Sequence, residues 1–128
     1  MSETEGAPAR LRDRNRHRTR SELLEAALAL FDEGGLATCT ADAVAKRVGI
    51  SKTTVYAYFP DGVAGMLRDQ YRAIAERVRR RGEELHGLAG TTEDKIAALT
   101  EALIDICAEP KIGRFYMMIS PALSPLLE

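Results

Sequence analysis

The stretch TADAVAKRVGISKTTVYAYF, residues 40–59, decides the fold of this 128-residue chain. Thr40 is a suitable N-cap for a short helix with its apolar side chains on one side, and Gly49 follows that helix in a tight turn. Ser51 can cap a second short helix over residues 52–59. A helix this short is not stable alone, so packing against its neighbours must hold it.

The second of these helices carries two kinds of side chain. Val55 and Phe59 are four residues apart, share a face, and are predicted to lie in the core. The other directions are occupied by the polar, basic and phenolic side chains of Lys52, Thr53, Thr54, Tyr56 and Tyr58. The spacing of Ala45 and Gly49 lets the two helices cross closely. Together these features indicate a helix-turn-helix, a motif whose second helix enters the major groove of DNA.

Helical periodicity extends over the rest of the chain. Four further helices are predicted, over residues 18–33, 62–85, 92–109 and 112–119. The helix over 92–109 has an apolar stripe made of Ile96, Leu99, Leu103, Ile106 and Cys107. Pro121 and Pro125 are expected to break up the end of the chain. The predicted fold class is all-α, with a three-helix head joined by a long fourth helix to a partial helical body for effector binding or dimerisation.

Residues 1–16 are expected to form a flexible basic arm, because they carry almost no large apolar side chains to bury. Arginines occupy alternate positions from Arg10 to Arg20 and are opposed only by Asp13. Such a charge density favours a polyanion such as nucleic acid, although the same stretch could simply keep the chain dissolved. Residues 1–81 carry a net charge of +4 and residues 82–128 a net charge of −5, so the two parts have net charges of opposite sign.

Length and composition exclude several classes of protein. The chain is long enough for one domain with a core and too short for a large multidomain enzyme. It has no apolar run approaching 18 residues and no secretory signal, so a cytoplasmic protein without a membrane segment is expected. Its two cysteines and two histidines have no metal-ligand spacing, so no metal and no cofactor are expected. The absence of a nucleophile–base pattern or a glycine-rich phosphate loop argues against an enzyme.

The surroundings of the two short helices resemble the N-terminal signature of the TetR family of bacterial transcriptional regulators. The matching positions are, in order, Arg20, Leu23, Ala26-Ala27, Leu30-Phe31, Gly34, Thr40, Val44-Ala45, Val48-Gly49-Ile50-Ser51, Thr54-Val55-Tyr56 and Tyr58-Phe59. The resemblance covers residues 17–77, the expected DNA-binding domain, with its helix-turn-helix motif over about 40–59. It implies that residues 78–128 are a partial regulatory domain and that a homodimer binds a palindromic DNA operator.

The resemblance and the residue types together predict the DNA contacts. The candidate residues are Arg20, Thr40, Ser51, Lys52, Thr53, Thr54, Tyr56 and Tyr58. The first turn of the second helix should carry the base-reading side chains, because a helix advances only about 1.5 Å per residue. Lys52 can donate to guanine, and the methyl groups of the following threonines can contact thymine. The two tyrosines are expected on phosphates, Thr40 beside a phosphate as a helix cap, and Arg20 as a source of nonspecific attraction.

Two features depart from the family pattern. Gly62 stands where the resemblance leads one to expect a lysine on a phosphate, and with Gly65 it should weaken the start of the next helix by about 1 kcal/mol per glycine. The chain also stops soon after its sixth helix, whereas the family's dimer generally uses two later helices. The chain is therefore either a fragment or a short regulator that dimerises differently.

The predicted function is that of a sequence-specific transcriptional regulator, a ligand-responsive repressor with double-stranded DNA and a small-molecule effector as partners. Phe115, Tyr116, Met117 and Met118 are candidates for the effector pocket, with plain helix packing as the other interpretation. The alternative function is an all-helical protein-interaction module without specific DNA binding. Salt dependence of binding to duplex DNA separates the two functions, because phosphate contacts weaken steeply with salt.

Overall fold

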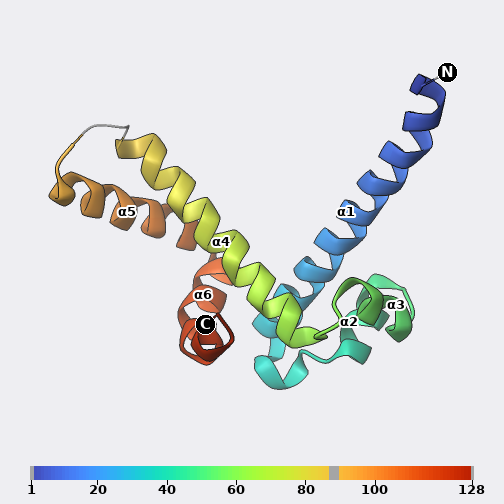
Figure 1. The fold of residues 1–128 in the computed structure, drawn as a ribbon. Coiled ribbons are helices and arrows are strands. Elements are labelled where there is room, and N and C mark those ends of the chain that lie inside the picture. Colours follow the sequence, from blue (N-terminus) through green and yellow to red (C-terminus); the bar gives the residue numbers. More distant parts are fainter. Residues whose placement is uncertain (1, 87–89, 128) are drawn as a thin grey trace.

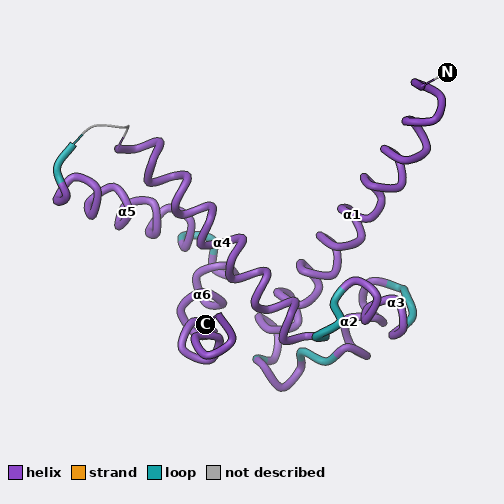
Figure 2. The backbone as a smooth tube through the Cα atoms, viewed as in Figure 1, coloured by secondary structure: helices purple, strands orange, loops and turns teal. Residues whose placement is uncertain are grey.

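The computed structural model describes residues 2–86 and 90–127. Every regular element in these two ranges is a helix or a helical turn, as Figure 1 and Figure 2 show, which confirms the all-α prediction. The elements are, in order, α1 (Ser2–Gly34), the short 3₁₀ turn η1 (Leu36–Thr38), α2 (Ala41–Val48), α3 (Lys52–Tyr58), α4 (Val63–His86), α5 (Thr92–Cys107) and α6 (Pro110–Leu127). None of these helices is both long enough and apolar enough to cross a membrane within the described residues.

The head of the molecule is built from the second half of α1, α2, α3 and the first turns of α4. Its core contains the fully buried side chains of Leu23, Ala27, Val44, Val55 and Met66. The predicted boundary between the two short helices is confirmed, since Gly49 ends α2 with a φ of 85° and its N–H donates to Ala45 O at 2.8 Å. Only glycine adopts this left-handed conformation without strain. The turn therefore fixes the angle at which α3 leaves α2.

The N-terminal half of α1 corrects the expectation of a flexible arm over residues 1–16. The helix extends back to Ser2 and projects away from the head as a single rod (Figure 1). Residues 9–18 contain neither glycine nor proline, and arginine, leucine and alanine are good helix formers. The packed part of α1 already provides the helix nucleus, so each residue added costs little. The basic charge of this segment therefore lies on a regular helix and not on irregular chain.

The long helix α4 connects the head to the rest of the body. The expected domain boundary at residue 77 falls inside this one continuous helix. Farther along, α4 pairs closely with α5 at Gly82, where an added Cβ would lie 2.8 Å from Leu99 Cδ2. The face of α5 that is buried is small, with Ala98 and Ala102 at its centre, while Ile96 remains 60% exposed. The predicted stripe is therefore only partly buried: Leu103, Ile106 and Cys107 are half-buried, whereas Ile96 and Leu99 are exposed.

The last helix joins the head to the body. Phe115 of α6 is fully buried, with its ring edge-to-face on that of Phe31 of α1 at a centroid distance of 5.4 Å. Tyr116 stacks on Tyr71 of α4 at 4.9 Å. The predicted break at Pro110 is confirmed, since α6 begins there, a position that does not need its missing N–H. The expected break-up of the end is wrong, because α6 continues past Pro121 and Pro125 to Leu127.

The tyrosine pair predicts a loss of stability at alkaline pH. Burial, and then the hydrogen bond with Tyr71, raise the pKa of Tyr116 to about 12. Its pKa in the unfolded chain is about 10, so the folded state favours the neutral phenol. This stabilisation is complete below about pH 10 and is lost as the pH rises towards about 12. Urea unfolding of the parent and of Tyr116→Phe should therefore converge at high pH, and parallel pH profiles would contradict this origin.

Candidate nucleic-acid interface

The short helix α3 lies at the outer edge of the head (Figure 1). Val55 is fully buried and Phe59, the residue that ends the helix, is 3% exposed, so both face the core as predicted. Lys52 and Thr53 at the other face are exposed, and Tyr56 is 45% exposed. The helix therefore has one packed side and one polar side free for a partner.

Ser51 and Thr54 organise the start of α3. Ser51 Oγ accepts the N–H of Thr54 at 3.1 Å, which confirms Ser51 as the N-cap. Its hydroxyl also bonds that of Thr54 at 2.7 Å. Thr54 is half-buried, and this bond fixes its side chain. The Thr54 hydroxyl is already engaged, so its methyl group is the part best suited to contact a base.

Lys52 and Thr40 bracket the polar side of the head. Lys52 Nζ lies 3.5 Å from Asp42 Oδ1 in an exposed ion pair. Such pairs contribute at most about 1 kcal/mol, so Lys52 can exchange Asp42 for a DNA acceptor at low cost. Thr40 accepts the N–H of Ala43 at 3.1 Å and is exposed, which confirms it as the cap of α2. Both side chains therefore belong to helix starts on the exposed side of the motif.

The two tyrosines of α3 have different environments. Tyr56 is exposed, and its ring lies against the backbone of Gly62. Tyr58 is half-buried and packs on the core cluster. A phenol that packs on the core with part of its surface exposed can still donate outward from its tip. The structure thus leaves both hydroxyls as candidates for phosphate contacts and gives Tyr58 a second role in packing.

Arg20 has a structural role that the sequence analysis did not anticipate. Its guanidinium pairs with Asp69 of α4 at 2.5 Å and lies over the ring of Phe59, 5.1 Å from the centroid. These contacts join α1 to α4 and to the end of α3. No local sequence pattern identifies Asp69 as the partner of Arg20. The two residues are 49 positions apart, and their pairing depends on the angle at which α1 and α4 cross. Arg20 therefore positions the helices of the head, and the nonspecific attraction to DNA predicted for it stays a prediction.

Gly62 explains the first departure from the family pattern. It precedes α4 with a φ of 66°, and an added Cβ would lie 3.1 Å from Tyr56 Cε1. Gly62 is thus a turn residue outside the helix, and the expected helix penalty does not apply to it. Gly65 is inside α4 and buried. A Cβ added there would lie 3.3 Å from Asp61 Cβ, so the missing side chain leaves room for Asp61.

Restoring the family's lysine is expected to destabilise the protein. Gly62→Lys forces a side chain into the left-handed conformation and against Tyr56, which should lower the free energy of unfolding by about 1–2 kcal/mol. Urea denaturation provides the measurement, with Ala64→Lys at an exposed position of the same helix as the matched control. An unchanged stability for Gly62→Lys would show that the turn has other conformations available.

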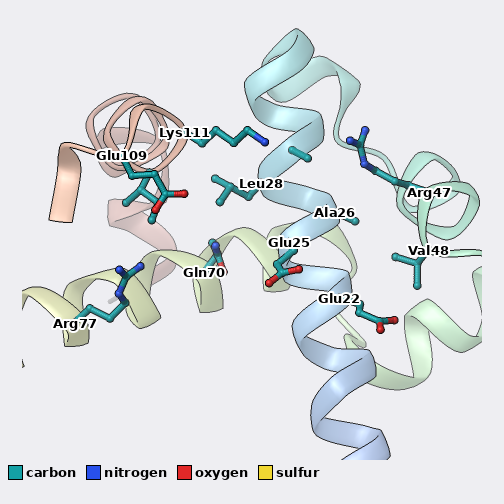
Figure 3. Close-up of a pocket in the computed structure, with 12 residues that line it drawn as sticks. Glu22, Glu25, Ala26, Leu28, Arg47, Val48, Gln70, Arg77, Glu109 and Lys111 are labelled. Atoms are coloured by element: carbon teal, nitrogen blue, oxygen red, sulfur yellow. The ribbon is translucent and has the colours of Figure 1, made fainter.

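A cleft of about 740 Å³ lies between α1, α4 and the start of α6, with the end of α2 at its edge (Figure 3). Charged and polar groups of both signs approach it, namely Glu25, Gln70, Arg77, Glu109 and Lys111. Leu28 and Ile112 supply apolar surface. Sequence reasoning missed these residues because they come from α1, α4, α6 and the turn before α6, and together they form no sequence motif. Within the described residues no three His, Cys, Asp or Glu side chains gather as a metal site requires.

The four residues predicted for an effector pocket are not brought together around this cleft. Phe115 is fully buried in the core and Tyr116 is stacked on Tyr71. Met117 and Met118 are each 67% exposed. These positions fit helix packing for the first two residues and an open surface for the last two.

The arrangement of the head defines a helix-turn-helix DNA-binding domain. Residues 23–61 match the family model of bacterial regulatory proteins of the tetR family. No curated protein matches the chain. These residues are therefore similar to the N-terminal DNA-binding domain of the TetR family, and this similarity supports a DNA-binding transcriptional regulator.

Proposed function

We propose that this regulator is a ligand-responsive repressor that binds a palindromic operator as a homodimer in the cytoplasm. The observation that carries the proposal is the orientation of α3, whose apolar side is buried while Lys52 and Thr53 are exposed. In the major groove, Lys52 would donate to guanine O6 or N7 and the Thr54 methyl group would contact a thymine methyl. Tyr56, Tyr58 and Thr40 would bind phosphates on either side and so set the register.

The proposed dimer is supported by exposed apolar side chains on α5 and α6. Among the described residues, Ile96, Ile104, Met117 and Met118 are 60–67% exposed. Large exposed apolar side chains are typical of protein interfaces, and a second copy would bury them. Two heads must then match successive major-groove faces about 34–36 Å apart. A monomeric mass in solution, with and without DNA, would contradict this part of the proposal.

The proposed effector site is the cleft between α1, α4 and α6. The proposed regulatory part is residues 78–128, which include the end of α4. The cleft contacts both the head, through Glu25, and the body, through Arg77 and Glu109. Groups of both signs beside the apolar side chain of Leu28 suit a small zwitterionic molecule. A ligand that binds one separation of α1 and α4 more tightly would shift the position of the head.

The proposal is tested by the base preference at Thr54. Thr54→Ser removes the methyl group and keeps the bond to Ser51, whereas Thr54→Val keeps a methyl group and removes the hydroxyl. Selection from random duplexes should show that the serine variant loses a thymine preference at one or two base pairs, a change of about 1 kcal/mol for the loss of one buried methyl group. The valine variant should retain that preference.

Equal preferences for the parent and the serine variant would contradict base contact by this methyl group. The alternative function, a protein-interaction module, is favoured instead if the parent fails to bind any duplex at low salt.

A further inference from the structure

The arginines of the α1 extension, defined as residues 9–18, are exposed and have no ion pair among the described residues, unlike most of the arginines that follow them. Arg79, Arg80 and Arg81 of α4 all pair with glutamates of their own helix. By contrast, Arg12 and Arg16 are exposed and have no ion pair among the described residues. The same holds for the other arginines of the extension, Arg10, Arg14 and Arg18. This helix therefore presents charge that nothing in the described part of the chain neutralises.

Arg20 fixes the direction in which the extension faces. Its side chain reaches Phe59 at the end of α3 and Asp69 of α4. At about 100° per residue, Arg16 and Arg12 lie about 40° and 80° around the helix from Arg20. Arg18 and Arg14 lie about 160° and 120° away, on the opposite side. Arg12 and Arg16 thus continue the side of α1 that meets the carboxyl end of α3.

We propose that Arg12 and Arg16 bind phosphates of the DNA that flanks the segment held by α3. The inference rests on the proposed function, since it needs α3 on the duplex. Arg12 is eight residues from Arg20, about 12 Å along the helix axis. DNA carries a phosphate about every 1.7 Å of its axis, so this reach covers three to four base pairs. The α1 extension would therefore lengthen the DNA-binding surface beyond the helix-turn-helix.

The composition of the extension favours duplex DNA over a membrane surface. Leu11 is a large apolar residue of this segment, and it lies on the side opposite Arg20. A helix that binds a membrane surface needs a continuous apolar face beside its basic one. Asp13 lies on the same side as Arg16 and reduces the positive charge there. Its removal should therefore strengthen DNA binding.

Salt titrations with a mixed-sequence 30-base-pair duplex test the proposal on the full chain. The test variant is R12Q/R16Q. The matched controls are R14Q/R18Q, on the opposite side of the same helix, and R72Q/K95Q, at exposed positions of α4 and α5. Each double variant removes two positive charges, so general effects of net charge are equal. The slope of log K against log salt is negative, and the loss of two phosphate contacts should make it less steep by about 1.8. The parent should then lose about tenfold more affinity than R12Q/R16Q between about 50 and 200 mM salt, while the controls follow the parent.

Three outcomes decide between the explanations. A reduced slope for R12Q/R16Q alone, with tighter binding by Asp13→Asn, supports the proposal. Equal changes in R12Q/R16Q and R14Q/R18Q overturn it, because they would show that the arginines attract DNA by their charge regardless of the side of α1 on which they lie. Lys52→Glu is measured alongside: if it weakens binding while R12Q/R16Q matches the parent, the flanking contact is wrong and the proposed function of α3 stands.

Discussion

Phe115→Ala is expected to lower the free energy of unfolding by about 3–5 kcal/mol, the largest stability change at any single position considered. Phe115 is fully buried, and its ring contacts that of Phe31 edge-to-face. Removing it opens a cavity where α6 meets α1, and it also removes an aromatic pair worth about 0.5–1.5 kcal/mol beyond its buried area. Neighbouring Ile112 and Ile119 are held in a helix and can fill the cavity only in part.

Urea denaturation monitored by circular dichroism measures this loss. Lys111→Ala is the matched control, because Lys111 lies on the same helix, is exposed, and is not among the side chains proposed to form the dimer interface. The control should change stability by less than about 0.5 kcal/mol. A Phe115→Ala variant as stable as the control would mean that α6 does not pack on α1 as described.

Lys52→Glu is expected to weaken binding to every DNA duplex by about 10- to 100-fold, or about 1.4–2.7 kcal/mol. The substitution removes a donor at the start of α3 and places a negative charge next to the phosphates. It also puts that charge close to Asp42, so no new ion pair compensates. The loss should be larger at low salt, where charge repulsion is less screened.

Fluorescence anisotropy with labelled duplexes measures the affinities. Lys95→Glu on α5 makes the same change in net charge at an exposed position far along the chain. If both variants weakened binding equally, the effect would belong to net charge and not to a contact by α3.

The head was largely predictable from sequence because its signals are local. The caps Thr40 and Ser51, the turn at Gly49 and the inward face of Val55 and Phe59 all depend on residues a few positions apart. Such short-range rules determine helix starts, helix ends and the sides that helices bury. The candidate base-reading residues therefore followed directly from the sequence.

The contacts between distant helices could not be predicted in this way. The pairing of Arg20 with Asp69 and the burial of Phe115 against Phe31 depend on crossing angles that no local pattern encodes. The role of Gly62 was misjudged because its positive φ is set by the turn between α3 and α4. The charged cleft was missed for the same reason, since its residues meet only in the folded chain.

The helical arm was misjudged for a thermodynamic reason. Low hydrophobicity in residues 1–16 argues against an independently folded segment, but this segment only prolongs a helix that the packed residues of α1 have already formed. Extension of an existing helix requires no new nucleus. The consequence for function is that Arg12 and Arg16 have defined directions relative to α3.

The central claim is that α3 presents its polar side to DNA, and amide chemical shifts of the labelled 14.0 kDa chain test it most directly. On titration with duplex, the largest shift changes are expected at residues 51–56 and at Thr40, with α5 unaffected. Shift changes concentrated on α5 and α6, with residues 51–56 unmoved, would contradict the claim.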